Sequence, residues 1–224
     1  MKKVIAFFIF TGIITVSHAQ YQFGIFAGPQ ISSAKYTITG IKQPTSNKYG
    51  FQAGVGFKIP FENHLYFSPA AFYSLKGYKV KFNQRAFPPD LKAIDNDVTL
   101  HTFELAFLLQ YDFSMQANHF FLKLGPSLDF QLSGREKFNL ENGNKVSRKM
   151  VFQYTDYGRY AANMLLHLGY ETSNGLIISA QYSHGLASIN NADGGPGIRH
   201  RVYGISIGKY IGKKKIVLDT SIKE

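Results

Sequence analysis

The sequence predicts an all-β protein, an eight-stranded antiparallel up-and-down barrel that spans a membrane. Three observations predict it: bulky apolar residues alternate with small or polar ones, short connections alternate with long ones, and aromatic residues gather near both ends of the alternating segments. In the segment 101–113, HTFELAFLLQYDF, Phe103 and Leu105 share one face while Glu104 and Gln110 share the other. This pattern is typical of a strand with two different faces.

The N-terminus has the pattern of a secretory signal peptide. Lys2 and Lys3 form a basic start, an apolar segment follows over 4–16, and small residues flank His18 before the expected cleavage after Ala19. The alternative is a membrane anchor, but the apolar run is shorter than the roughly 20 residues that span a bilayer. We expect a signal peptide over 1–19, a barrel domain over 20–211 and a basic periplasmic tail over 212–224.

Composition limits the class of protein and its partners. The chain has no cysteine, which excludes a small secreted domain held by disulfides. The formal charge of +11 and the pI of 9.6 favour partners that carry phosphate or carboxylate groups. An exported chain rarely meets nucleic acid, so we expect no nucleic-acid partner and favour lipid headgroup phosphates.

Eight segments show the alternation, and each is about 10 to 13 residues long, which is longer than the ~5–6 of globular sheets and fits a bilayer. Their apolar positions run over 21–31, 51–59, 65–75, 101–113, 120–132, 160–170, 176–182 and 203–211. Pro29, Pro69 and Pro126 fall in the middle of three of them and predict β-bulges.

The connections differ in length on the two sides. PFENH, SMQAN and ETSNG are short turns, whereas the segments 33–49, 79–98, 134–157 and 187–199 are long and polar. Short periplasmic turns and long extracellular loops are typical of outer-membrane barrels, and both termini would then be periplasmic.

The interior volume of an eight-stranded barrel decides which strand face points into the barrel and which points to lipid. Its interior is only just wide enough to be filled by side chains, so dozens of Phe, Tyr, Leu and Ile side chains do not fit there, whereas Gly, Ser and a few charged residues do. Aromatic residues at both strand ends bracket an aliphatic band, as anchoring at two membrane interfaces predicts. The alternative is a soluble lipocalin-like barrel or sandwich with the apolar face inward.

Several motifs resemble one family. The segments YFSPAAFYSLKG (66–77), HTFELAFLLQYDF (101–113), FFLKLGPSLDFQLSG (120–134), AQYSHGLASI (180–189) and RVYGISIGKYI (201–211) are similar to the strands of small Gram-negative outer-membrane β-barrels, often called porin-family or PorT-like proteins. The resemblance covers roughly residues 20 to 211. It implies the fold and the cell outer membrane as the location, but no biochemical role. One departure is that GKKKIVLDTSIKE follows the aromatic end of the last strand.

The inward-facing charges predict structure rather than transport. Eight strands leave no continuous aqueous channel. The interior cations are therefore expected to form an ion-pair network with the interior carboxylates. This network contains Lys58, Lys76, Lys123 and Arg159 on one side and Glu104, Asp112, Asp129 and Glu171 on the other.

Two histidines are candidates for chemistry. His184 lies where small outer-membrane lipid A deacylases carry a His-x-Ser-Asn motif, but the chain has Leu186 where the serine would be, and Ser183 is on the opposite strand face. His167 is expected to form a buried hydrogen-bonded pair with Glu171. The histidines show no metal-ligand spacing. We expect no enzyme activity, no cofactor, and no catalytic or metal-binding residues.

The remaining basic residues gather in or beside the long loops, where they could meet lipopolysaccharide phosphates or remain solvated. They are Lys35, Lys42, Lys48, Lys79, Lys81, Arg85, Lys92, Lys137, Lys145, Arg148, Lys149, Arg199 and Arg201. The sequence thus predicts a monomeric outer-membrane barrel that interacts with an unknown protein partner or with lipid through its loops. An outer-membrane lipid-modifying enzyme and a transport or secretion-accessory barrel are the alternatives.

Overall fold

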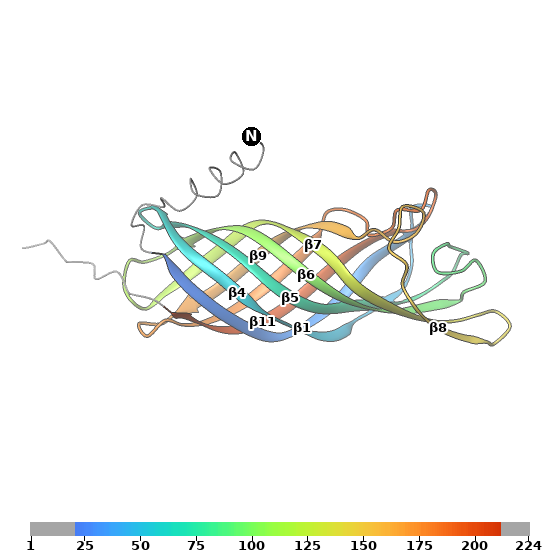
Figure 1. The fold of residues 1–224 in the computed structure, drawn as a ribbon, viewed down its shortest axis with the longest axis horizontal. Helices are drawn as coiled ribbons and strands as arrows, with labels where there is room; N and C mark the ends of the chain where they lie inside the picture. Colours follow the sequence, from blue (N-terminus) through green and yellow to red (C-terminus); the bar gives the residue numbers. More distant parts are fainter. Residues whose placement is uncertain (1–20, 212–224) are drawn as a thin grey trace, which may run out of the picture.

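The computed structural model describes residues 21–211, which form one closed ring of antiparallel strands (Figure 1). The strands are β1 (Gln22–Ile38), β2 (Ile41–Lys42), β3 (Thr45–Ser46), β4 (Lys48–Glu62), β5 (Leu65–Lys81), β6 (Asp95–Asp112), β7 (His119–Asn139), β8 (Lys145–Lys149), β9 (Tyr160–Glu171), β10 (Leu176–Gly185) and β11 (Gly197–Ile211). The predicted signal peptide and basic tail lie outside the described residues. Within 21–211, no helix is long and apolar enough to cross a membrane.

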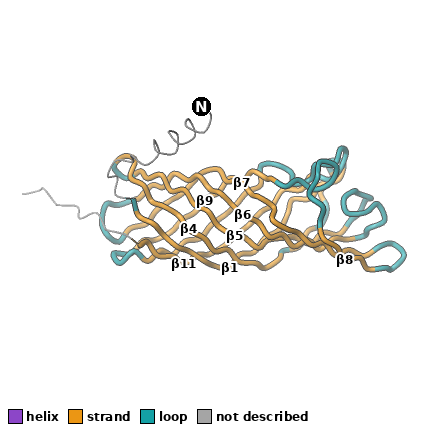
Figure 2. The backbone as a smooth tube through the Cα atoms, in the orientation of Figure 1, coloured by secondary structure: helices purple, strands orange, loops and turns teal. Residues whose placement is uncertain are grey.

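Eight of these strands build the wall of the barrel. They follow one another in the order β1, β4, β5, β6, β7, β9, β10 and β11, and pairing between β11 and β1 closes the ring. The short strands β2, β3 and β8 pair with β1, β5 and β7 at the end that carries the long loops. Three short turns lie at the other end, where β1 begins and β11 ends (Figure 2). The predicted strand number and alternation of loop lengths are confirmed.

The alternate strand positions that carry bulky apolar residues face outward, as the interior volume of an eight-stranded barrel predicted. Phe107, Leu109 and Leu168 are 47%, 54% and 54% exposed on the outer surface, although all three lie within strands of the barrel wall. Aromatic side chains border this band at both ends, for example Phe120 at the short-turn end and Tyr203 at the long-loop end. An exposed apolar band between two aromatic girdles is the outer surface of a membrane barrel.

The strands at the long-loop end extend well beyond the predicted segments, and the polarity of the two faces reverses there. β7 has 21 residues, and β5 and β6 also continue into segments that were predicted as polar loops. In this extension the outward positions carry charged residues such as Lys79, Arg135 and Lys137, whereas most inward positions are apolar, with Asn96 and Glu136 as buried polar exceptions. The inward side chains form a buried core that includes Tyr36, Ile38, Tyr78, Val80, Val98, Leu100, Met150, Tyr157, Ala161, Ile189 and Ile198. The extension is therefore built like a soluble barrel on top of a membrane barrel.

The three mid-strand prolines do not form bulges, which corrects the prediction. Each proline and the residue before it lack a strand partner on one side, but the register is the same before and after the gap. On the other side the ladder continues, and Pro29 pairs with Phe51. The pairing tolerates each proline because its missing N–H faces the gap. The register shifts lie elsewhere, between Pro60 and Glu62 and between His101 and Thr102.

Glycines let the backbones approach closely at two of these gaps. A Cβ atom on Gly28 would lie 1.8 Å from the carbonyl oxygen of Ile205, and one on Gly125 would lie 2.1 Å from that of Phe107. Each glycine directly precedes a proline, so the Gly-Pro pair fits a place where the neighbouring strand is too close for a side chain.

The inward positions of β6 show that the interior is layered. From the short-turn end they include Asp112, Leu108, Glu104 and Leu100 in this order, with Gln110, Ala106 and Thr102 between them. The Leu108 layer also contains Phe72 and Leu165 as buried residues, with Phe26 packed against them. The interior of the membrane-spanning part is therefore not uniformly small and polar, and this apolar layer separates two polar ones.

Candidate functional site

The predicted interior ion pairs are present, but they form two clusters instead of one network. In the first, Lys76 Nζ lies 2.8 Å from Oε1 of Glu104 and 2.6 Å from Oδ2 of Asp129, and all three side chains are buried. Strands β5, β6 and β7 each supply one member. The two carboxylates share one ammonium, so the charge of Lys76 is compensated by both, and the cluster has one more carboxylate than cation.

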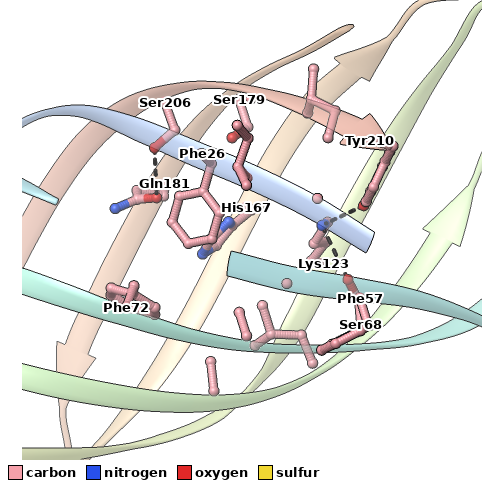
Figure 3. Close-up of a pocket in the computed structure, with 18 of the residues that line it drawn as sticks. Phe26, Phe57, Ser68, Phe72, Lys123, His167, Ser179, Gln181, Ser206 and Tyr210 are labelled. Carbon is pink, nitrogen blue, oxygen red and sulfur yellow. Dashed lines mark hydrogen bonds between the residues drawn. The ribbon is translucent and has the colours of Figure 1, made fainter. Parts of the chain in front are cut away.

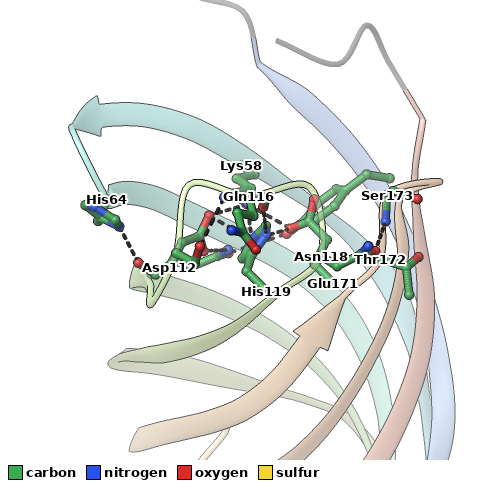
Figure 4. A network of polar contacts seen from close by, with 12 residues as sticks. Lys58, His64, Asp112, Gln116, Asn118, His119, Glu171, Thr172 and Ser173 are labelled. Carbon is green, nitrogen blue, oxygen red and sulfur yellow. Dashed lines mark hydrogen bonds and ion pairs between the residues drawn. The ribbon is translucent and has the colours of Figure 1, made fainter. Parts of the chain in front are cut away.

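The second cluster lies at the short-turn end (Figure 4). Lys58 Nζ is 2.6 Å from Oδ2 of Asp112 and 2.7 Å from Oε2 of Glu171. His119 Nε2 lies 3.0 Å from the same Asp112 oxygen, while its Nδ1 lies 2.8 Å from the carbonyl oxygen of Gln116. The turn between β6 and β7 thus positions the imidazole beside the two carboxylates.

This second cluster has the ligand types of a metal site. One ligand atom each of Asp112, His119 and Glu171 lies within 4.8 Å of the others. Sequence reasoning missed the group, because its members end or begin three different strands and follow no local spacing. The ammonium of Lys58 bonds to both carboxylates and already supplies positive charge there. The arrangement therefore works as a closed ion cluster, in which a metal ion would compete with Lys58.

Two of the predicted network members lie elsewhere. Arg159 is exposed at the long-loop end, where its guanidinium carbon lies 5.7 Å from the ring centroid of Phe152. Lys123 points inward but bonds to hydroxyl groups, Ser68 Oγ at 3.1 Å and Tyr210 Oη at 3.2 Å (Figure 3). Within residues 21–211, Lys123 has no carboxylate oxygen within 4.0 Å.

His167 does not pair with Glu171, so that prediction is wrong. Glu171 is held by Lys58 and His119, whereas His167 lies beside Lys123 in the strand ladder. Its Nε2 atom is buried and has no hydrogen-bond partner among the described residues. His167, Lys123, Gln181, Ser179 and Ser206 line an interior cavity of about 50 Å³ (Figure 3), a volume that suits a few water molecules.

The geometry around His184 does not assemble a serine nucleophile. His184 lies on the outer side, where its Nδ1 is 2.8 Å from the hydroxyl of Tyr182. Ser183 is buried on the inner face, as strand alternation predicted. A base on one face of a strand cannot take a proton from a hydroxyl on the other face, so these two residues form no dyad.

The outer surface of the extension contains a basic groove. A cavity of about 660 Å³ opens between the β5–β7 wall and the β8 hairpin, and Lys79, Lys81, Lys137 and Lys145 line it with Asp95 and Asp97. The two carboxylates are already engaged. Asp97 forms ion pairs with Lys48 and with Lys79, and Asp95 accepts hydrogen bonds from the backbone and side-chain nitrogens of Asn139.

Three of these lysines keep their positive charge available to a ligand. Lys81, Lys137 and Lys145 are exposed and form no ion pair within the described part of the chain. Four lysines and two carboxylates line the groove, so it has an excess of positive charge, which suits an anionic ligand.

A buried carboxylate joins the long loops to one another. Glu136 on β7 accepts hydrogen bonds from Arg148 Nε at 2.7 Å, Tyr157 Oη at 2.8 Å and Asn96 Nδ2 at 3.3 Å. Arg148 also donates to the carbonyl oxygen of Pro89 at 2.8 Å. Burial opposes the charge on Arg148, but the hydrogen bond and charge of Glu136 raise its pKa overall. This contact set fixes the loops over the apolar core.

The closed ring with an apolar outer band defines the protein as a transmembrane β-barrel. Residues 17–191 match the family model described as "Outer membrane protein beta-barrel domain", and the chain belongs to this family. Its location is the outer membrane. The PorT-like part of the resemblance stays a prediction. No curated protein matches the chain significantly.

Solved structures with the same kind of fold have low sequence identity to this chain. Ail of Yersinia pestis, in complex with the heparin analogue sucrose octasulfate, is 13% identical at a TM-score of 0.45 and covers 86% of this chain and 99% of its own. OprG from Pseudomonas aeruginosa is 13% identical at a TM-score of 0.44, and the match covers 88% of this chain and 99% of OprG. Neisserial surface protein A is 13% identical at a TM-score of 0.41, and the match covers 83% of this chain and 96% of that protein's chain.

Proposed function

We propose that the protein is a cell-surface interaction protein, in which the barrel anchors an extension that binds a polyanionic ligand. The long-loop end faces outward in this proposal, because outer-membrane barrels keep short turns in the periplasm and longer loops outside. The extension then stands above the outer aromatic girdle, where its charged outer face is open to ligands in the extracellular space.

The observation that carries the proposal is the basic groove beside the β8 hairpin. Lys81, Lys137 and Lys145 line about 660 Å³ of open space, and none of them has an ion-pair partner among the described residues. The neighbouring Asp95 and Asp97 are already bonded within the protein. A ligand with several sulfate, phosphate or carboxylate groups would supply the missing negative charge.

The interior supports anchoring in preference to transport. The core around Tyr36 and Tyr78 consists of buried side chains, and the apolar layer of Phe72 and Leu108 lines a cavity of only about 50 Å³. The cavity between the polar layers is small. We therefore propose that no open pore exists, and we expect no conductance step when the protein is inserted into a planar bilayer.

Catalysis is not part of the proposal. Ser183 and His184 lie on opposite faces of β10, and the interior carboxylates are engaged in ion pairs with Lys58 and Lys76. These contacts support the role of an interaction protein over that of a lipid-modifying enzyme.

The test is binding of heparin, as a probe polyanion, to the protein in nanodiscs of zwitterionic lipid. Replacing Lys81, Lys137 and Lys145 together with Gln is expected to weaken binding about tenfold or more, because three charge-assisted contacts are lost. Replacing Lys35, Arg199 and Arg201 with Gln changes the net charge equally on another face, and binding is expected to be retained. Equal weakening by both triple variants would show that net charge, not the groove, attracts the probe.

A further inference from the structure

Three cations lie together on the outer face of the β1–β11 seam, on other strands than those that line the basic groove. Lys35 on β1 is the direct strand partner of Arg199 on β11, and Arg201 is the partner of Ser33 on β1 and of His184 on β10. We call Lys35, Arg199 and Arg201 the seam cluster. Like charges directly opposite each other on a sheet are unfavourable, so this arrangement costs stability unless an anion lies between them.

The neighbouring strands offer the seam cluster no counter-charge. β1, β10 and β11 contain no Asp or Glu, and no carboxylate of the described residues lies within 4.0 Å of the three cations. Lys35 and Arg199 are exposed. The Nε atom of Arg201 is buried and has no hydrogen-bond partner within residues 21–211. A buried guanidinium nitrogen without an acceptor is a donor available to a ligand oxygen.

The position of the cluster indicates what kind of anion it meets. Tyr203 and Tyr182 lie directly below it on the outer face, with their ring centroids 4.8 Å apart, and they belong to the outer aromatic girdle. At about 3.4 Å per residue, Arg201 lies about 7 Å and Arg199 about 14 Å along the strand from Tyr203. Aromatic girdles lie at the level of the lipid headgroups. The cations therefore face the headgroup layer from the side.

We propose that Lys35, Arg199 and Arg201 bind a phosphate group on an anionic lipid of the outward-facing leaflet. Guanidinium groups suit this ligand because their planar donors match phosphate oxygens in pairs, and Lys35 adds a third positive charge. The lateral orientation favours a lipid over a soluble polyanion, since the cations adjoin the lipid-facing girdle. The site does not depend on ligand binding by the groove, because it lies on other strands and has its own unpaired donor.

The test is native mass spectrometry of the whole barrel released from nanodiscs that contain lipid A with both phosphates, compared with lipid A from which the phosphates have been removed. The wild-type barrel is expected to retain one phosphorylated molecule and to release the dephosphorylated one. Replacing the three cations with Gln is expected to lower retention about tenfold or more. Replacing Lys81, Lys137 and Lys145 with Gln is the matched control and is expected to keep the lipid.

Two further variants guard against a folding defect. Arg201→Gln alone removes the buried Nε donor, whereas Arg199→Lys with Arg201→Lys keeps the charge and loses the paired geometry, so both are expected to give intermediate retention. A heat-dependent gel shift checks that each barrel is closed. Equal retention of phosphorylated and dephosphorylated lipid, or equal loss in both triple variants, would overturn the proposal. The proposal would also be overturned if soluble inositol hexakisphosphate displaced the lipid from the wild type while the variants of the seam cluster retained the lipid as well as the wild type does.

Discussion

Arg148 Nε donates a hydrogen bond to Oε1 of Glu136 at 2.7 Å, and this contact joins the β8 hairpin to the barrel wall. Glu136→Ala removes it together with the bonds from Tyr157 and Asn96. Hydrogen bonds to charged groups contribute about 1.5–3 kcal/mol each, so we expect residues 144–159 to open more readily. Hydrogen–deuterium exchange of these amides is the measurement. Lys137→Ala, on the outer face of the same strand, is the control and should leave their exchange unchanged, because the exposed Lys137 forms no ion pair within the described residues.

Asp156 makes the stability of the segment 144–159 depend on pH. Burial, with the charge of Glu136 as a second cause, raises the pKa of Asp156 above its ordinary value of 3.8, and its Oδ1 has no hydrogen-bond partner among the described residues. Because the folded pKa is the higher one, the contribution of Asp156 to the stability of the packed loop is greatest below pH 3.8 and is lost as the pH rises through the folded pKa.

Asp156→Asn cannot ionise, so we expect amides 150–159 of this variant to exchange more slowly than those of the wild type at neutral pH. The difference should disappear as the pH falls below 3.8. Asp193→Asn, in an exposed part of a neighbouring loop, is the control. Slower exchange of the wild type at neutral pH would contradict the prediction.

Lys76 is the shared cation of two carboxylates inside the membrane-spanning part. Lys76→Met leaves Glu104 and Asp129 buried without their common cation, which is expected to lower the free energy of unfolding by about 3–5 kcal/mol. Urea unfolding in lipid vesicles, followed by the heat-dependent gel shift, measures this loss. Lys79→Met is the control, because its side chain is 56% exposed and exposed pairs contribute only about 1 kcal/mol or less. Equal unfolding midpoints for the two variants would show that the buried pair is dispensable.

Gly28 is needed for closure of the ring. Gly28→Ala places a methyl group 1.8 Å from the carbonyl oxygen of Ile205, so β1 and β11 must separate at the seam. We expect a marked loss of the compact, heat-sensitive band on gels of unboiled protein. Gly56→Ala is the matched control, since its nearest neighbour would be 3.3 Å away. A normal band for Gly28→Ala would mean that the seam can relax.

The sequence was sufficient for the wall because side-chain direction alternates along every strand. Phe107 and Leu109 could be assigned outward, and Lys76 and Glu104 inward, from parity and interior volume alone. The extension was missed because its polarity is reversed. Tyr78 and Val80 alternate with Lys79 and Lys81 as a strand requires, but a lipid-facing interpretation treats such a segment as a polar loop.

The partners inside the barrel could not be predicted in the same way. Parity places His167 and Glu171 on one face, but the height of each residue in the tilted barrel depends on the register of all eight strands. Glu171 therefore meets Lys58, which is distant in sequence, and Lys123 meets hydroxyl groups. Arg159 lies just before β9 begins, so the strand parity did not apply to it.

The reversed polarity of β5, β6 and β7 gives the protein a way to make insertion one-directional. Because the outer face of the extension is charged and does not suit lipid, we expect the core around Tyr36, Tyr78 and Leu100 to assemble after these strand ends have crossed the membrane. Burying each large apolar side chain there contributes about 1.5–3 kcal/mol, and this free energy is released on the far side. The folded extension then opposes withdrawal of the barrel from the membrane, because withdrawing any strand would first require that core to unfold.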